Sequence, residues 1–309
     1  MHRRHRRHRS DSVVSLCLTR LHKSIKMVAL QLLTVAAHHC GTMARQENYY
    51  PLKFDPTTGE YYLPIPSPHS NLRLTPYRPD SDPKFQVLYL NDPRVYQNLC
   101  GPPFPYLREH ADAWNARVHA QSQKLFEAMG RGDKYIDGCP LRVIREVQED
   151  GSQIFIGDLN VDRESNDVPW LAEDEKDNET KSNGDPTIVW SLGCKFISYS
   201  SRSNPVMMRF TDYLEPGHHR RGIMSLVVST LINTWMVPRM NCHRITGATL
   251  VGNRASTKVF FNNGFVQQED VPDWAPIPEG RGGGKMGIHV LRWNLKSEDG
   301  YPEANEENS

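Results

Sequence analysis

GHHRRGIMSLVVSTLINTW (Gly217–Trp235), followed by GNRASTKVFFNNGF (Gly252–Phe265), is the part of the sequence that decides the fold. The first segment is a glycine-containing turn that opens a helix with apolar residues at helical spacing. A helix start carries unpaired backbone N–H groups and the positive end of the helix dipole, which together suit a phosphate group. The second segment opens with Asn253, a typical helix N-cap, after the strand-like run 244–251. Together they indicate a site for a nucleotide-type cofactor.

Read separately, each segment has a simpler interpretation. A glycine near a helix start is most often a loop or cap residue with no ligand. An Asn-x-x-Ser stretch before an apolar run is usually only an N-cap. The order and spacing of the two segments, with a strand between them, favour the cofactor site.

The two segments together resemble the GNAT superfamily of acetyl-CoA-dependent N-acetyltransferases, whose cofactor loop reads Q/R-x-x-G-x-G/A at the start of the central helix. Here the loop runs from His219 to Met224, and Gly222 matches the pattern outright. His219 and Met224 depart from it, but Gly-Ile-Met at this place is similar to the RimJ/RimL-type branch, which acetylates ribosomal-protein N-termini. The second segment fits the family's later motif at Asn253, Ser256, Val259, Phe260, Asn263, Gly264 and Phe265.

This resemblance implies acetyl-CoA as the co-substrate and assigns residues to its site. It implies an oxyanion-stabilising backbone N–H near Tyr213 and Leu214, where the strand before the cofactor loop splays from its neighbour. The cofactor-binding residues that it implies are Leu214, His219, Arg220, Arg221, Gly222, Ile223, Met224, Asn253 and Ser256.

Acetyl transfer to an amine also needs a proton for the departing thiolate and a deprotonated nucleophile. Many family members donate that proton from a Tyr at the position that Phe260 occupies here. The RimJ/RimL-type resemblance suggests Ser256 instead, although a Ser in a first helical turn commonly bonds to the backbone. No general base can be chosen, and Glu215, His218 and His289 are candidates by location only.

The resemblance spans roughly residues 72–295 and implies a single α/β domain over 49–296, with a mixed, mostly antiparallel central sheet flanked by helices. The Pro- and Tyr-rich residues 49–70 are interpreted as an extended lead-in, and the acidic residues 162–185 as a solvated loop. Expected helices are 82–90, 109–129, 222–237 (closed by Pro238) and 253–263, and expected strands are 72–78, 141–148, 153–161, 190–193, 212–214, 242–251, 264–271 and 286–295.

Residues 194–211, CKFISYSSRSNPVMMRFT, interrupt a strand that the family has in one piece. Joining the flanks gives WSLGDYLEPGHH, a continuous strand and loop, which suggests a retained intron translated in frame. The alternative is a genuine surface excursion from a strand that restarts.

Composition supports a folded chain, because 38% of the 309 residues are hydrophobic. Residues 1–42 carry eight basic residues against Asp11 alone, whereas the remainder has 29 basic and 35 acidic residues and gives no support to nucleic-acid binding. The basic extension, 1–48, is interpreted as upstream sequence ahead of a start at Met43, as a mitochondrial transit peptide or as an RNA-binding tail. Residues 297–309 form an acidic tail that is predicted to be disordered.

Six scattered cysteines lack a metal-ligand or disulfide spacing and indicate reduced intracellular thiols. The apolar run 27–37 is too short to span a bilayer. We therefore expect a cytoplasmic N-acetyltransferase, mitochondrial if 1–42 is a transit peptide, acting as a monomer or homodimer without metal, membrane or nucleic acid. Its acceptor is a protein N-terminus or a small amine. The alternative is a catalytically impaired acyl-CoA-binding protein, which Phe260 and the interrupted strand favour.

Overall fold

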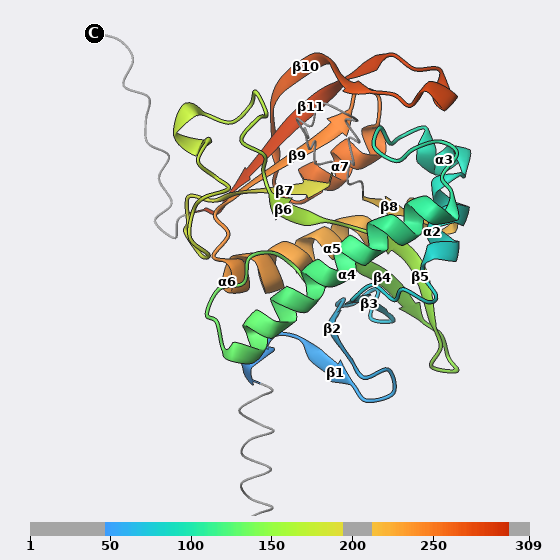
Figure 1. Ribbon diagram of the computed structural model, residues 1–309, viewed down its shortest axis with the longest axis vertical. Coiled ribbons are helices and arrows are strands. Elements are labelled where there is room, and N and C mark those ends of the chain that lie inside the picture. Colours follow the sequence, from blue (N-terminus) through green and yellow to red (C-terminus); the bar gives the residue numbers. More distant parts are fainter. Residues whose placement is uncertain (1–46, 194–211, 297–309) are drawn as a thin grey trace, which may run out of the picture. The chain divides into compact units, whose positions relative to one another are not determined.

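The computed structural model describes residues 47–193 and 212–296. Within these ranges the chain after Pro51 forms two sheets (Figure 1). Every pairing is antiparallel except that of β7 with β9. The first sheet has the order β1 (Lys53–Asp55), β2 (Glu60–Pro64), β3 (Leu72–Thr75), β4 (Val143–Val147), β5 (Gln153–Asp158), β8 (Tyr213–Leu214). The second has the order β10 (Val266–Pro276), β11 (Lys285–Asn294), β9 (Arg244–Leu250), β7 (Val189–Gly193), β6 (Val161–Arg163). The predicted mixed, mostly antiparallel architecture flanked by helices is confirmed.

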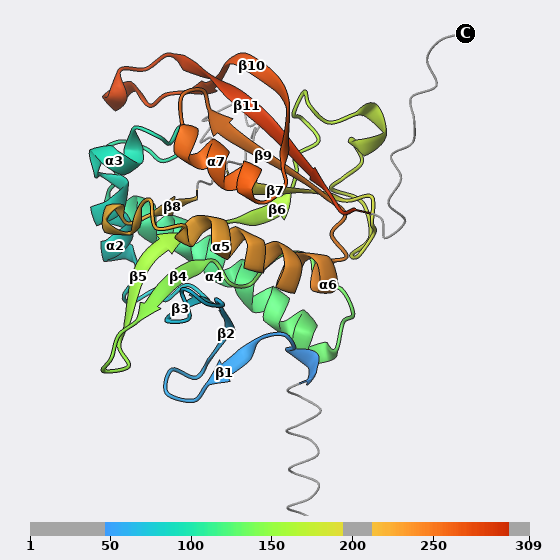
Figure 2. The same cartoon turned by 180° about the vertical axis from the view of Figure 1, so that it is seen from behind.

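The main helices are α2 (Pro83–Leu90), α4 (Arg108–Arg131), α5 (Ile223–Thr230) and α7 (Arg254–Asn262), and α3 (Pro93–Tyr96) is a single turn. Helix α4 lies nearest the viewer in Figure 1, and α5 does so from behind in Figure 2. The sequence explains α4, because its buried residues recur every three or four positions and its end at Gly132 has φ +84°. These buried residues are Ala111, Asn115, Val118, Ser122, Leu125 and Met129.

Strands β7 and β8 belong to different sheets: β7 pairs with β6, and β8 pairs with β5. Because β5 and β6 follow each other closely along the chain, the two antiparallel pairings can be compared as one ladder. Paired residue numbers add up to 353 along β6–β7, as in Arg163 with Trp190, and to 371 along β5–β8, as in Asp158 with Tyr213. The difference equals the 18 residues 194–211, which lie outside the described residues. The register on both sides is therefore the one that an uninterrupted strand would have.

The alternation of hydrogen bonds also continues across this point. Glu164 N donates to Val189 O, Gly193 N donates to Asn160 O, and Glu215 N donates to Ile156 O. On the β5–β6 run these bonds lie four residues apart, and all three fall on hydrogen-bonded positions of one antiparallel ladder once residues 194–211 are left out. The two flanks also lie close together, since a Cβ built on Gly193 would be 3.5 Å from Oδ2 of Asp212.

We predict that a variant lacking residues 194–211 folds and is more stable than the full chain. A closed loop of 18 residues costs about 2–3 kcal/mol of chain entropy, and a domain of this size gains a few degrees of melting temperature per kcal/mol. We expect calorimetry to give a rise of about 5 °C and tighter binding of acetyl-CoA.

The matched control lacks only residues 195–211. It keeps Cys194 between Gly193 and Asp212, so the side chains of β8 would move to the opposite faces of the sheet. This control should be less stable than the 18-residue deletion. A lower melting temperature of the 18-residue deletion than of the full chain would identify the segment as a true structural insertion.

Two segments make more contacts with the sheets than the sequence predicted. The extended lead-in over residues 49–70 contains the strands β1 and β2, and β2 pairs with β3 and buries Leu63. Residues 162–185 form in part the solvated loop that was predicted, because Asp167, Glu173, Asp174, Asp177 and Glu179 are exposed. Glu164 and Asn178 are buried, however, and the Asn178 side chain donates to Glu164 O and Val189 O. These buried polar groups are satisfied by hydrogen bonds to the chain rather than to solvent, and they anchor the loop to β7.

The central helix does not end at Pro238 as predicted. Residues Leu231–Met236 form a π-helical turn and α6 (Val237–Met240) continues beyond the proline. Proline lacks an N–H and clashes with the carbonyl four residues earlier, and a widened turn relieves both problems. The helix ends instead at Asn241, which has φ +51°.

The remaining strands and helices agree with the predicted ranges within a few residues, except that β5 and β6 are separate strands and β10 extends to Pro276. The predictions for residues 1–46 and 297–309 fall outside the described residues and stay predictions. In the described part of the chain, no helix has both the length and the apolar character needed to cross a membrane.

Candidate active site

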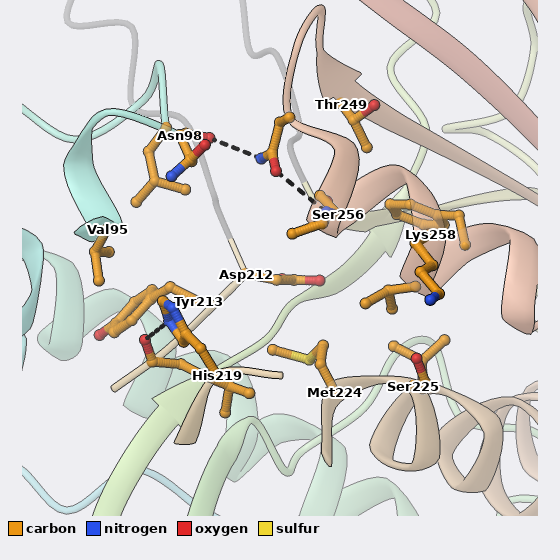
Figure 3. Close-up of a pocket in the computed structure, with 18 of the residues that line it drawn as sticks. Val95, Asn98, Asp212, Tyr213, His219, Met224, Ser225, Thr249, Ser256 and Lys258 are labelled. Carbon is orange, nitrogen blue, oxygen red and sulfur yellow. Dashed lines mark hydrogen bonds between the residues drawn. The ribbon is translucent and has the colours of Figure 1, made fainter. Parts of the chain in front are cut away.

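A cavity of about 950 Å³ opens where β7 and β8 separate (Figure 3). Its walls come from the loop after α3, the ends of β7 and β8, the first turns of α5 and α7, and the end of β9. The predicted residues that line it are Tyr213, Leu214, His219, Arg220, Gly222, Ile223, Met224, Asn253 and Ser256. Arg221 is not among the lining residues, and its carbonyl accepts a hydrogen bond from His69 Nε2 at 2.9 Å. The fold thus brings the two sequence motifs together.

The turn before α5 presents backbone N–H groups to this cavity. Gly222 is the N-cap with φ +75°, a conformation that glycine adopts without strain, and Arg220 has φ +61°. The first intrahelical bond runs from Leu226 N to Gly222 O. The N–H groups of residues 223–225 therefore have no partner in the helix, which suits phosphate oxygens.

The edge of β8 supplies one free backbone donor. Tyr213 pairs with Asp158, Leu214 pairs with Gly157, and Glu215 N donates to Ile156 O at 2.7 Å. Because backbone groups face the partner strand at alternate residues, Tyr213 and Glu215 face β5 and Leu214 faces away from it. Of the two predicted oxyanion residues, the geometry favours Leu214.

The other side of β8 has no neighbouring strand in its sheet. The Leu214 carbonyl on this free edge accepts a hydrogen bond from His219 Nε2 at 2.9 Å. No acceptor for the Leu214 N–H exists among the described residues. An edge donor of this kind, held rigidly beside a cavity, is what stabilises a developing oxyanion.

At the start of α7, the side chain of Asn253 caps the helix and the hydroxyl of Ser256 does not take part in the cap. Asn253 Oδ1 accepts from Ser256 N at 3.1 Å, and Asn253 Nδ2 donates to Asn98 O at 3.3 Å (Figure 3). The side chain of Asn253 therefore caps the helix, as predicted for an N-cap Asn. The Ser256 hydroxyl has no hydrogen-bond partner among the described residues, so it is not used in capping.

The ring of Phe260 forms part of the cavity wall. It packs edge-on against Phe265 at 4.9 Å between centroids and lies so close to Gly247 that any Cβ there would approach it to 2.4 Å. It supplies no ionisable group, so the proton donor must come from elsewhere.

The three predicted base candidates are held by other groups. His218 Nδ1 lies 2.5 Å from Glu215 Oε2, and Nε2 lies 3.5 Å from Glu146 Oε2. Burial alone would raise the pKa of Glu215, but hydrogen bonds from the Gly217 backbone and His218 hold that pKa below its usual value. His289 pairs with Asp270 at 2.6 Å on the β10–β11 hairpin and does not line the cavity.

Asp212, which belongs to neither sequence motif, is the single carboxylate among the described residues that line the cavity. It directly precedes β8, and its side chain points into the cavity between Ser256 and Met224 (Figure 3). An acidic residue directly before the apolar pair Tyr213–Leu214 was the available signal. Two lining cations were also not predicted: Arg94, which comes from α3, and Lys258, which lies within the second motif but is not one of its matching residues. Among the described residues, no group of three or more His, Cys, Asp or Glu side chains could hold a metal ion.

No protein-family model and no curated protein sequence matches this chain. Several solved structures are similar to it in fold. One is a ribosomal-protein-S5-alanine acetyltransferase from Vibrio fischeri, with 16% identity, a TM-score of 0.46, and 78% of this chain and 99% of that chain covered.

Two further structures show the same range of similarity. RimL, a ribosomal L7/L12 alpha-N-protein acetyltransferase, has 14% identity, a TM-score of 0.47 and coverage of 79% of this chain and 99% of its own. A spermidine N-acetyltransferase from Vibrio cholerae in complex with CoA and spermine has 12% identity, a TM-score of 0.41 and coverage of 73% and 96%. Because these TM-scores lie below 0.5, the similarity alone assigns no activity to this chain.

Proposed function

We propose that this protein is an acetyl-CoA-dependent N-acetyltransferase of the GNAT type that transfers an acetyl group to a primary amine. The observation that carries the proposal is the free Leu214 N–H on the edge of β8, facing the same cavity as the unpaired N–H groups at the start of α5. The Leu214 N–H suits a thioester carbonyl, and the N–H groups at the start of α5 suit a pyrophosphate.

The residues present fit acetyl-CoA. The turn from Arg220 to Ser225 would hold its phosphates, with Arg220 as a cation beside them. Bound acetyl-CoA supplies the activated acetyl group as a thioester. Leu214 N–H would then donate to the carbonyl oxygen as negative charge develops on it, and removal of one such donor typically costs about 3 kcal/mol. Ser256 Oγ would donate a proton to the departing thiolate.

The acceptor is proposed to be a protein N-terminus or a small-molecule amine, bound by a monomer or homodimer. Cys139 and Cys242 are free thiols in the described part of the chain. Free thiols are typical of reducing compartments, and they support a cytoplasmic location, or a mitochondrial one if residues 1–42 are a transit peptide.

The second candidate function is an acyl-CoA-binding protein with impaired catalysis. Phe260 in place of a phenol and the interruption between Gly193 and Asp212 favour it. The two candidates differ in one measurement, the release of free thiol from acetyl-CoA.

We would measure thiol release with three acceptors: a peptide with a free N-terminus, an N-terminally blocked peptide with one lysine, and a polyamine. An enzyme releases thiol only when an acceptor is present and yields a product heavier by one acetyl group. A binder gives a calorimetric signal with acetyl-CoA and no thiol with any acceptor. Absence of both signals would contradict both functions.

A further inference from the structure

We propose that Asp212 is the catalytic residue that accepts the proton of the acceptor amine. The inference rests on the proposed acetyltransferase function and adds the general base that the sequence motifs do not supply. Asp212 lies two residues before Leu214, the proposed oxyanion donor, and lines the same cavity as Ser256. Its side chain points between Ser256 and Met224, into the open space (Figure 3).

The carboxylate is held in place by one oxygen only. Oδ1 accepts a hydrogen bond from Asn160 N at 2.9 Å, which takes the position of a ladder bond where the strands separate. No hydrogen bond to Oδ2 is made by any described residue. Asn160 is in turn fixed by Arg142, whose Nη1 donates to Asn160 Oδ1 at 2.7 Å. One oxygen is therefore positioned and the other is available to an ammonium group.

The surroundings set the proton affinity of this carboxylate. Burial is the largest cause, and together with the negative charge of Asp158 it raises the pKa of Asp212 to about 7, against the lowering effects of the Asn160 N–H and Arg142. A base is most effective when its pKa lies near the working pH. The α-amino groups of peptides have a pKa of about 8 and lysine side chains one of about 10.4. Proton transfer to the Asp212 carboxylate is therefore less unfavourable from an α-ammonium group than from a lysine side chain. The other charged or titratable groups lining the cavity are Arg94, Cys100, Tyr213, His218, His219, Arg220 and Lys258.

With Asp212 as the base, each proton that moves in the reaction has a donor and an acceptor. The ammonium form of the acceptor gives one proton to the Asp212 carboxylate, and the freed nitrogen lone pair forms the N–C bond to the thioester carbonyl carbon. The C–S bond breaks with its electron pair on sulfur, and Ser256 Oγ protonates that thiolate. The nitrogen then loses a second proton, which returns to Ser256 Oγ and leaves the neutral amide. Asp212 then releases its proton to solvent through the cavity, to which it is partly exposed.

The test is the pH dependence of kcat at saturating acetyl-CoA and a saturating unblocked peptide. The intact enzyme should lose activity about tenfold per pH unit below a midpoint near 7. This midpoint should move little with temperature, as for a carboxyl group, whereas a His midpoint would fall on heating. Asp212→Asn should lower kcat at pH 7.5 at least about tenfold and remove this acid limb, and Asp212→Glu should restore part of both.

The matched control is Asp162→Asn. Asp162 accepts from the side chain of the same Asn160 at 2.6 Å but does not line the cavity, so its loss should leave the acid limb in place. Calorimetry of acetyl-CoA binding separates this inference from the proposed function, because Asp212→Asn should bind acetyl-CoA as the intact protein does. An Asp212→Asn variant that keeps the acid limb, or an intact enzyme with a strongly temperature-dependent midpoint, would overturn the role of Asp212.

Stability gives a readout that does not depend on activity. The folded-state pKa of Asp212 lies above its unfolded value of 3.8, so the folded state binds more protons and its stability falls as the pH rises from about 4 to about 7. Above that window the intact protein carries the cost of a buried charge. Asp212→Asn keeps an oxygen acceptor for Asn160 N without this charge, so its melting temperature at pH 8 should equal or exceed that of the intact protein. A much lower value would mean that the carboxylate has a structural role.

Discussion

Gly222→Asp is expected to weaken acetyl-CoA binding about 100-fold or more. Gly222 caps α5 and its N–H neighbours face the cavity, so a carboxylate there would lie beside the phosphate oxygens. Two like charges about 4 Å apart in a partly buried site repel by about 4 kcal/mol. The change also removes the positive potential that the helix start offers to an anion. Calorimetric titration with acetyl-CoA measures the loss directly.

Gly222→Asn is the matched control for this change. Asn and Asp have the same shape, both tolerate the positive φ of +75° at this position, and a Cβ on Gly222 would meet no atom within 4 Å. Any backbone strain is therefore common to both variants, and only the charge differs. We expect Gly222→Asn to weaken acetyl-CoA binding no more than about fivefold, which corresponds to a loss of binding free energy of at most about 1 kcal/mol. Equal affinity of the Asp variant and the intact protein would remove the basis for the cofactor turn.

The sequence predicted this turn because the signal is local. A helix start with glycine, an N-cap and an apolar period are properties of a few adjacent residues. Asn253 is the N-cap of α7 as predicted, and Gly222, predicted as the first residue of its helix, is the N-cap of α5. The same holds for α4, whose buried residues recur every three or four positions. The long-range features were harder. Nothing local predicts that Asn178 reaches back to β7, and this bond anchors a largely exposed acidic segment to the sheet.

The site itself shows where local reasoning ends. Tyr213 and Leu214 are equivalent in sequence terms as oxyanion residues, and only the pairing with β5 separates them, because it fixes which N–H faces the partner strand. Asp212 was missed for a related reason. Its chemistry depends on its enclosure near the end of β7, on Asn160 and on Asp158, all brought together by the sheet.

Ser256→Ala is expected to lower turnover about 100-fold or more, with the Michaelis constant for acetyl-CoA nearly unchanged. The reason is that general acid catalysis acts on the departing thiolate in the transition state and adds little to ground-state binding. The hydroxyl has no partner among the described residues, and the backbone N–H of Ser256 is capped by Asn253 instead. A purely structural serine would use its hydroxyl in the cap. Steady-state kinetics with saturating acceptor measure both constants.

Thr257→Ala provides the comparison within the same helical turn. The Thr257 hydroxyl is engaged, since its Oγ1 lies 2.9 Å from Thr249 Oγ1 and donates to Asn253 O at 3.1 Å, and it does not line the cavity. Its removal should lower stability by about 1 kcal/mol and leave turnover within about threefold of the intact enzyme. The Thr257 hydroxyl is thus expected to stabilise the helix, and the Ser256 hydroxyl to take part in the reaction. If Ser256→Ala also lost less than about threefold, its hydroxyl would not be the acid. A water molecule in the cavity would then be the better donor, because Phe260 offers no proton.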